Sequence, residues 1–434
     1  MTTASDRGTG QTYVYFGGLT LLVYLITPNS YLVDFTTAYM LKNQLHLGPE
    51  AVSRFRLLTA IPIYLAFVFG FTRDLWNPLG RRDRGYFLLF GPLTGLVFLW
   101  MAFAKLSYAS LFVGMMAVML AFGFVRAAYQ GLLALVGQEK LMSGRLAVLW
   151  QIILSIPVLL GAGASGYFVE YLKPSQTFLI LAAMAFGIGL TGLWRPGAVF
   201  AGAYEAPQAR GSDIRGDLKR LFRHKAIYPA VLLILLFQFA PGANTPLQYY
   251  LSDKLHAPDT VYGLFYAIFA AAFIPMFFIY GWLCKRVKFG KLLFWGIIIT
   301  IPQMIPLAFI HTANQALLLA VPIGAMGGIF AAAVFDLAIR SCPPGLQGTL
   351  MMLVESANLL STRGGDILGV RIYKLSAAHG FTYCVIAITV VYALMLPVML
   401  LIPKPLLATA DGESDPAAEQ DMLSEIARTA PAGT

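Results

Sequence analysis

Long apolar stretches follow one another along almost the whole chain, and the short segments between them carry most of the charged residues. Each stretch approaches or exceeds the ~20 apolar residues that an α-helix needs to cross the core of a bilayer. We therefore expect an all-α membrane protein. The pattern predicts twelve transmembrane helices, over residues 13–41, 51–71, 86–103, 107–136, 147–168, 177–193, 227–250, 261–283, 292–310, 316–340, 346–373 and 381–402.

One segment of the chain occurs twice, at a constant offset of 210 residues. The residues that return are Tyr39, Leu41, Leu45 and His46, with the mates Tyr249, Leu251, Leu255 and His256. Each copy then runs into an apolar helix that ends in a glycine and, four positions later, a charge: Gly70 with Asp74, and Gly281 with Lys285. A duplicated unit of this kind is typical of secondary transporters built from two parallel six-helix halves. The sequence thus predicts two pseudo-symmetric six-helix bundles, residues 1–199 and 226–403.

Composition supports a membrane protein, since 58% of the residues are hydrophobic and 12% are charged. That charged share is about half of the share in a soluble domain. With the N-terminus inside, 21 Lys and Arg residues fall on the cytoplasmic side and eight on the other. This bias predicts a multi-pass protein of the cytoplasmic (inner) membrane with both termini in the cytoplasm. Topology accounts for the net charge of +10, so no nucleic-acid partner is needed.

The segments outside the bundles are polar. Residues 200–225 form a basic cytoplasmic linker, whose part 212–225 suits an amphipathic helix on anionic lipid headgroups. Residues 404–434 are acidic and rich in alanine, which predicts a disordered cytoplasmic tail. The polar start of the chain predicts no signal peptide.

No pattern of catalytic residues, phosphate loop or metal-ligand spacing is present, and the three cysteines are scattered. We therefore expect no enzyme activity, cofactor or metal site. Because no ATP-binding motif occurs either, the energy for transport must come from an ion or substrate gradient.

The loop after the second predicted helix reads Gly70-Phe-Thr-Arg-Asp74-Leu-Trp-Asn-Pro-Leu-Gly80-Arg81-Arg82. It resembles the signature loop of the major facilitator superfamily, Gly-x-x-x-Asp-x-x-Gly-Arg-Arg, with three extra residues before the second glycine. Gly70 would permit close contact between helices, and Asp74 would accept hydrogen bonds from the other half. Arg81 and Arg82 would bind lipid phosphates. We interpret this loop as part of a gate.

A turn near the end of the tenth predicted helix, Cys342-Pro-Pro-Gly-Leu-Gln-Gly-Thr, leads into a helix that carries Glu355-Ser-Ala-Asn358-Leu. These residues resemble the corresponding signature of the folate-biopterin transporter family. The resemblance implies a folate- or pterin-like organic anion as cargo. The chain lacks the acidic residue that relatives often carry in the fourth helix, and it has Arg126 there. The cargo is therefore left open among folates, sugars, siderophores and muropeptides.

The eleventh predicted helix carries a polar stripe in which Glu355, Thr362 and Asp366 lie within about 20° of one line at ~100° per residue. Asn358 and Arg363 flank it. An unpaired charge in hydrocarbon costs at least ~2.5–3.5 kcal/mol, so the stripe must face protein or a wet cavity.

Other candidates lie on the helices that line the central path of such a transporter. The predicted cargo-binding residues are Asp34, Thr37, Arg126, Tyr129, Gln130, Gln238, Asn244, Asn358 and Arg363. Arg126 either binds cargo or forms a structural ion pair with Asp34 or Glu355. Asp336 and Arg340, near an inner helix end, are predicted gate residues. Trp150 and Gln151 are interpreted as packing residues.

The interpretation is a secondary transporter that moves a polar organic metabolite by alternating access and works as a monomer in the lipid bilayer. Because burial raises a carboxyl pKa and a nearby arginine lowers it, an acid beside an arginine can exchange protons as the cavity opens. The predicted proton-coupling residues are Glu355, Asp34 and Asp366. An alternative of another class is a non-transporting assembly factor of the pigment-carrier type, which would have a central cavity sealed by apolar side chains.

Overall fold

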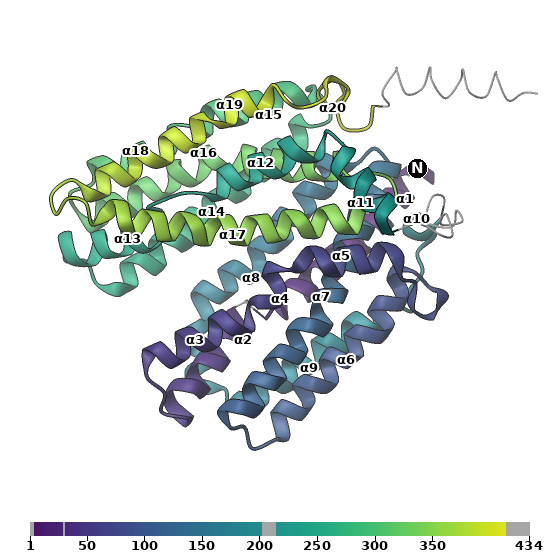
Figure 1. Cartoon of the computed structure of the whole chain (residues 1–434), viewed down its shortest axis with the longest axis horizontal. Coiled ribbons are helices and arrows are strands. Elements are labelled where there is room, and N and C mark those ends of the chain that lie inside the picture. Colours follow the sequence, from purple (N-terminus) through teal and green to yellow (C-terminus); the bar gives the residue numbers. More distant parts are fainter. Residues whose placement is uncertain (1–3, 29–30, 202–213, 414–434) are drawn as a thin grey trace, which may run out of the picture.

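The computed structural model describes residues 4–28, 31–201 and 214–413, and within these ranges all regular structure is helical (Figure 1). The helices up to the linker are α1 (Ala4–Leu25), α2 (Tyr31–Tyr39), η1 (Met40–Gln44), α3 (Pro49–Thr59), α4 (Ile61–Tyr64), α5 (Ala66–Leu75), η2 (Pro78–Gly80), α6 (Asp83–Phe103), α7 (Tyr108–Glu139), α8 (Ser143–Tyr171), α9 (Pro174–Thr191) and α10 (Gly197–Phe200). The later helices are α11 (Ile214–Arg223), α12 (Ile227–Gln238), α13 (Thr245–Tyr249), η4 (Tyr250–Lys254), α14 (Asp259–Leu283), α15 (Phe289–Thr300), η5 (Ile305–Phe309), α16 (Ala313–Arg340), α17 (Gln347–Tyr373), α18 (Gly380–Ala393), α19 (Met395–Met399) and α20 (Lys404–Ala408).

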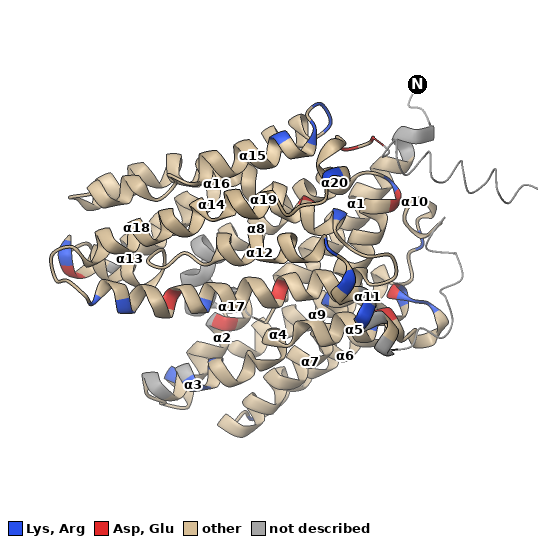
Figure 2. Ribbon diagram, turned by 45° about the horizontal axis from the view of Figure 1, so that its top comes forward, with Lys and Arg blue, Asp and Glu red and all other residues tan. Residues whose placement is uncertain are grey.

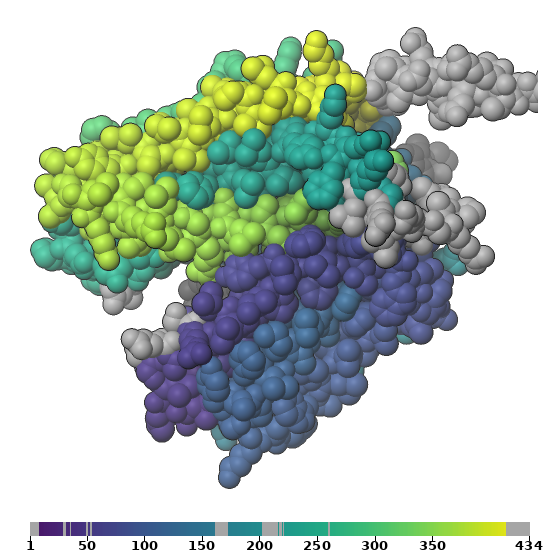
Figure 3. Space-filling model, viewed as in Figure 1, coloured from purple at the N-terminus to yellow at the C-terminus, as the bar shows by residue number. Residues whose placement is uncertain are grey.

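Two groups of helices lie side by side in Figure 1, α1–α9 in purple to blue and α12–α19 in teal to yellow. We call them the N-bundle and the C-bundle. Within them, α6 packs on α9 and α14 packs on α16. Between them, α5 and α7 contact α17, and α8 contacts α14 and α16. The groups touch over the right-hand part of the molecule and are separated by a notch at the left (Figure 3).

Eight helical segments of the described chain are long and apolar enough to cross a membrane. They are α6, α7, residues 143–160 of α8, α9, α14, residues 289–309, α16 and residues 380–399. The other four predicted spans are broken or charged, which is consistent with twelve. The first span is not one helix, because α1 ends at Leu25, α2 begins at Tyr31, and Pro28 lies between them. The second is divided into α3, α4 and α5, and the seventh into α12 and α13. The eleventh, α17, is continuous but carries the polar stripe.

The sequence repeat reappears in the backbone. One turn of π-helix follows α2 at Met40–Gln44, and another follows α13 at Tyr250–Lys254, at the same offset of 210 residues. Each turn is followed by a histidine in the left-handed region, His46 at φ 51° and His256 at φ 49°. A non-glycine residue rarely adopts positive φ, so matching outliers at matching positions show that the two copies fold alike.

Most of the Lys and Arg residues gather at the right-hand end of the molecule (Figure 2). We call it the basic end; it carries the α5–α6 loop with Arg81 and Arg82, the α14–α15 loop with Lys285 and Lys288, and α20. The opposite end is called the far end.

The prediction that the chain is disordered from residue 404 is wrong for residues 404–413. Lys404–Ala408 forms α20, which packs against α15, and the next residues hydrogen-bond to both bundles. The composition of residues 404–434 did not predict this ordered segment, because only a few of its residues, such as Thr409 and Asp411, make the hydrogen bonds that hold it. Residues 414–434 of the predicted tail and residues 202–213 of the linker lie outside the described residues; the rest of the linker contains α11.

Candidate functional site

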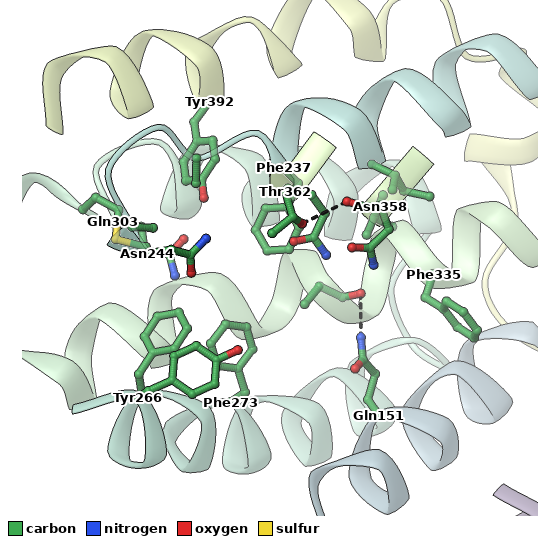
Figure 4. A pocket seen from close by; sticks show the side chains of 18 of the residues that line it. Gln151, Phe237, Asn244, Tyr266, Phe273, Gln303, Phe335, Asn358, Thr362 and Tyr392 are labelled. Carbon is green, nitrogen blue, oxygen red and sulfur yellow. Dashed lines mark hydrogen bonds between the residues drawn. The ribbon is translucent and has the colours of Figure 1, made fainter. Parts of the chain in front are cut away.

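A cavity of about 440 Å³ lies mainly in the C-bundle and is closed on one side by α8 (Figure 4). Aromatic side chains form much of its wall: Trp150, Phe237, Phe265, Tyr266, Phe269, Phe273, Phe335 and Tyr392. Its polar groups are Gln151, Gln238, Asn244, Gln303, Asn358 and Thr362. None of the described residues that line this central cavity is charged. The volume lies in the range of small-molecule sites.

Several of these amides have hydrogen-bonding capacity left for a ligand. In the described part of the chain, the side chains of Gln238, Asn244 and Asn358 make no hydrogen bond, and the buried Oε1 of Gln303 has no partner. By contrast, Gln151 donates to the carbonyl of Ala331 at 3.0 Å. Buried polar groups are normally paired, so the free Oε1 of Gln303 points to a polar ligand or to water. The half-buried amides of Gln238, Asn244 and Asn358 add donors and acceptors to the same cavity wall.

The aromatic wall contains a stacked pair that joins the two bundles. The rings of Trp150 on α8 and Phe335 on α16 are parallel within 6°, with centroids 4.0 Å apart. Phe269 and Phe273, which also line the cavity, pack edge to face beside Tyr266. The cavity wall thus contains several aromatic rings on which a flat ligand could stack.

A break in the seventh span positions Asn244. The α-helix stops at Gln238, and Gly242 has a φ of 120°, where a side chain would be strained. The chain resumes helix at Thr245, whose backbone N–H and hydroxyl donate to the Asp366 carboxylate at 3.0 and 2.8 Å. Asp366 therefore caps the new helix and is not among the residues that line the central cavity.

A second cavity of about 350 Å³ lies on the other side of α17, toward the far end. We call it the outer cavity. Asp34 and Thr37 line it together with Arg56 and Arg363. Asp34 accepts a hydrogen bond from Arg56 at 2.7 Å, and both side chains are half-exposed. Arg363 is exposed and has no ion-pair partner among the described residues, so this wall carries one cation in excess.

Arg126 on α7 forms an ion pair with Glu355 on α17 at 2.8 Å. Of the two partners predicted from sequence, the structure selects Glu355. The pair borders a small void whose lining shares Pro28 and Met119 with the outer cavity. Arg126 also lies over the Tyr24 ring, 5.3 Å from its centroid, and its Nε has no hydrogen-bond partner.

The polar stripe of α17 therefore divides among three surroundings. Asn358 and Thr362 face the central cavity, Glu355 faces Arg126, and Asp366 caps α13. These parts of the stripe thus face protein or a cavity, as expected from the cost of an unpaired charge in hydrocarbon, and each neighbouring helix receives a different part.

Two residues predicted to bind cargo lie inside the N-bundle instead. Tyr129 is fully buried, and its hydroxyl is 2.5 Å from that of Thr20. Gln130, 1% exposed, donates to the Tyr24 hydroxyl at 3.4 Å. Neither lines the central or the outer cavity. Helical spacing placed them beside Arg126 but did not reveal that Tyr24 and Thr20 would cover them.

Sequence reasoning also missed part of the central cavity. Trp150 and Gln151 were interpreted as packing residues, yet both line it, and Gln303 was not singled out. The sequence did contain a signal for Gln303, because an amide side chain is unusual within a predicted apolar span.

At the basic end, Asp74 joins the bundles. Its carboxylate accepts hydrogen bonds from the backbone of Gly348 at 3.1 Å and of Thr349 at 2.7 Å, and from the Thr349 hydroxyl at 2.6 Å. Arg73 holds the same carboxylate from the other side, at 2.8 Å. Gly70 is required here, because a Cβ on it would lie 2.3 Å from the Gly348 carbonyl oxygen.

The other predicted gate residues also lie at the basic end. Arg81 is exposed, and the Arg82 backbone N–H donates to the Asn77 side chain at 2.5 Å. Asp336 is fully buried and accepts from Tyr280 and from Arg340, each at 2.8 Å.

The sequence matches the profile of the Major Facilitator Superfamily over residues 19–362. This chain belongs to that superfamily. It is 25% identical over 378 residues to the folate-biopterin transporter of Synechocystis sp. (strain ATCC 27184 / PCC 6803 / Kazusa), covering 80% of this chain and 73% of the relative. It is 26% identical over 174 residues to the multidrug resistance protein MdtG of Serratia proteamaculans (strain 568), covering 39% of this chain and 42% of the relative.

The fold agrees with that of a solved superfamily member. The structure of the human organic anion transporter MFSD10 (TETRAN) covers 89% of this chain and 98% of its own length, with a TM-score of 0.62 and 13% identity. The chain is therefore a multi-pass membrane protein of the major facilitator fold, and its superfamily points to transport rather than catalysis.

Proposed function

We propose that the protein is a secondary active transporter that binds a polar organic metabolite in the central cavity and moves it by alternating access. One observation carries this proposal: the central cavity is walled by aromatic rings and by amides with unused hydrogen-bonding capacity. A non-transporting assembly factor would have a central cavity sealed by apolar side chains. This cavity instead has six polar side chains in its lining.

The proposed setting is the cytoplasmic membrane, with the basic end and both termini inside. The excess of Lys and Arg at this end supports that orientation. The contacts of Asp74 with α17 close the basic end, and the outer cavity lies toward the far end. This arrangement corresponds to a state that faces outward. The two bundles, residues 1–199 and 226–403, would rock about it as a monomer, joined by the linker 200–225.

We favour a folate- or pterin-like cargo. A fused heterocycle is flat and presents donors and acceptors along its edges, so it would stack on Trp150 or Phe237 and pair with Asn358 or Asn244. The similarity to a folate-biopterin transporter supports this choice. A carboxylate on such a cargo would meet Arg363 in the outer cavity, since the central cavity offers no charge. Sugar-, siderophore- or muropeptide-type cargo is the alternative.

We further propose proton coupling through Glu355. The Arg126–Glu355 pair joins the two bundles, and the void beside it adjoins the outer cavity. Asp34, which pairs with Arg56 in that cavity, is the second candidate. Asp366 is the least favoured of the three candidates, because its hydrogen bonds with Thr245 indicate that it caps α13.

Uptake by the purified protein in proteoliposomes, measured across a panel of folates, pterins, sugars, siderophores and peptides under an imposed pH gradient, tests the proposal. For the transported compound, Asn358→Leu should raise KM about tenfold, because a buried hydrogen bond is worth about 1–1.5 kcal/mol. Leu360→Met, an exposed residue on the same helix, is the matched control. If a folded protein transported no compound of the panel, the assembly-factor alternative would be favoured.

A further inference from the structure

Backbone hydrogen bonds join the segment after α20 to the α14–α15 loop of the C-bundle and to the first residue of α15. The backbone N–H of Asp411 donates to the carbonyl of Cys284 at 2.8 Å, and that of Phe289 donates to the carbonyl of Thr409 at 3.2 Å. Arg340, which pairs with Asp336, also donates to the Thr409 carbonyl, at 3.3 Å. The segment is therefore held in place by the C-bundle before any contact with the N-bundle is considered.

From this position, Asp411 reaches across to the N-bundle. Its Oδ1 accepts a hydrogen bond from the backbone N–H of Gly144 at 2.9 Å, and its Oδ2 accepts from Nε of Arg145 at 2.6 Å. Its side chain is fully buried. Gly144 and Arg145 lie in the first turn of α8, where backbone N–H groups have no partner within the helix. The carboxylate satisfies one of them and favours the positive end of the helix dipole.

The geometry matches that of Asp74 at α17. Gly144 and Gly348 are each the second residue of their helix, and each donates its N–H to a carboxylate from the other bundle. Arg145 and Thr349 are each the third residue, and both bond the second oxygen of that carboxylate. The helix of each bundle that follows its fourth span is thus capped by an acid that comes from the opposite bundle.

The two carboxylates differ in their origin. Asp74 belongs to the repeated loop of the N-bundle, whereas the mate of Asp74 in the C-bundle loop is Lys285, which is exposed. The C-bundle loop therefore lacks the acid, and the chain supplies one from the segment beyond the last span, paired to this same loop through Cys284 and Asp411.

We propose that Asp411 is a second inter-bundle latch, which replaces the acid missing from the repeated loop and holds the basic end closed together with Asp74. Opening of the basic end must separate Asp411 from Arg145, because the two are anchored to different bundles. The segment 409–411 is accordingly part of the gate. This inference rests on the alternating access proposed above, but its test needs no cargo.

The native cysteines report on the two latches. Cys284 is buried under the Asp411 segment, and Cys342 is buried beside the Asp74 latch, where its carbonyl accepts from Gln138 of the N-bundle at 2.7 Å. Cys384 is buried within the C-bundle, against Gly369 of α17 and away from both latches. Alkylation by N-ethylmaleimide, followed for each cysteine by mass spectrometry on the full-length protein, therefore separates local from global opening.

In Asp411→Ala, both Cys284 and Cys342 should be alkylated roughly tenfold faster, since removing one hydrogen-bonded charge shifts an equilibrium by about that factor or more. Cys384 should keep its rate. The matched comparison is Glu413→Ala, which removes an exposed carboxylate that accepts, among the described residues, only from the Ala410 backbone N–H of the same segment, at 2.9 Å, and leaves the Asp411–Arg145 contact in place. Arg145→Ala is the second variant, because it leaves the backbone pairing of the segment intact and should also expose both cysteines.

Faster alkylation of Cys284 alone in both variants would mean that only the terminal segment frays, and it would overturn the proposal. Unchanged rates at both cysteines would overturn it as well. Neither result would bear on the cargo site, and failure to find a cargo would leave the alkylation result unaffected.

Discussion

Arg126 on α7 and Glu355 on α17 form an ion pair across the two bundles, with Nη2 and Oε1 2.8 Å apart. The side chains are 11% and 19% exposed, so water screens the pair little. Since α7 and α17 belong to different bundles, any rocking of the bundles changes the distance between the two charges. Each side chain would then need a new partner for its charge, because an unpaired charge in a mostly buried position is costly. A proton on Glu355 would serve this purpose.

Glu355→Gln should therefore abolish pH-driven accumulation while leaving exchange of cargo across the membrane largely intact. The amide keeps the shape of the side chain but cannot take up a proton. Accumulation under an imposed pH gradient and exchange without a gradient are measured in the same proteoliposomes. Asp366→Asn tests the third coupling candidate in the same assay: if Asp366 serves only to cap α13, its loss lowers stability and leaves accumulation coupled to the pH gradient. Normal accumulation by Glu355→Gln would remove this residue from the mechanism.

Arg126→Ala should reduce transport of anionic and neutral cargo alike. Its partner in the structure is Glu355, and breaking a buried pair costs about 3–5 kcal/mol whatever the cargo. Arg363→Ala should instead raise KM for an anionic cargo only, and by tenfold at most, because Arg363 is exposed and lines the outer cavity. The measurement is KM for a carboxylated cargo and its uncharged analogue in both variants. A selective loss of the anion in Arg126→Ala would return Arg126 to the cargo site.

The sequence repeat predicted more of the fold than local patterns did. The matched residues around His46 and His256 adopt the same π-turn and the same positive φ. The break of the seventh span falls at Pro241 and Gly242, two residue types that interrupt helices. The interruption of the first span near Pro28 was not predicted, although the run Pro28-Asn29-Ser30 between two apolar segments is typical of a turn.

The candidate site was predicted less well, because it depends on which helix faces which. Arg126 and Glu355 are over two hundred positions apart, and spacing on one helix could not choose between Glu355 and Asp34 as the partner. Tyr129 shares a helix face with Arg126 but bonds Thr20 inside the N-bundle. Asp411 is one acid among several in an acidic segment, and only the structure shows that it meets Arg145.

Gly70→Ala should disturb the closed basic end. A Cβ at this position would lie 2.3 Å from the Gly348 carbonyl oxygen, and backbone on both sides leaves no flexible side chain to move away. Overpacking of this kind costs about 1–3 kcal/mol, so the alkylation rate of Cys342 should rise. Gly18→Ala is the control, because no atom lies within 4 Å of its Cβ. Equal rates in the two variants would show that α5 and α17 can separate without opening the gate.

The pH profile of Cys284 provides the last test. Burial raises the pKa of this thiol to about 12, with a further contribution from the charges of Asp411 and Asp336. Because the thiolate is the reactive form, alkylation in the unaltered protein should rise about tenfold per pH unit from pH 7 to 10 without levelling off. An exposed thiol would level off near its ordinary pKa of about 8.5.

The direction of the pKa shift of Cys284 also determines the pH range in which this thiol affects the gate. Because the buried state has the higher pKa, its contribution to stability is complete below about pH 8.5 and is lost only as the pH rises toward 12. Titration of Cys284 therefore does not open the basic end at neutral pH. In Asp411→Ala, which removes both a covering residue and a negative charge, the profile should move toward lower pH. A profile that levels off near pH 8.5 in the unaltered protein would mean that Cys284 is already in contact with water, and that the segment 409–411 does not cover it.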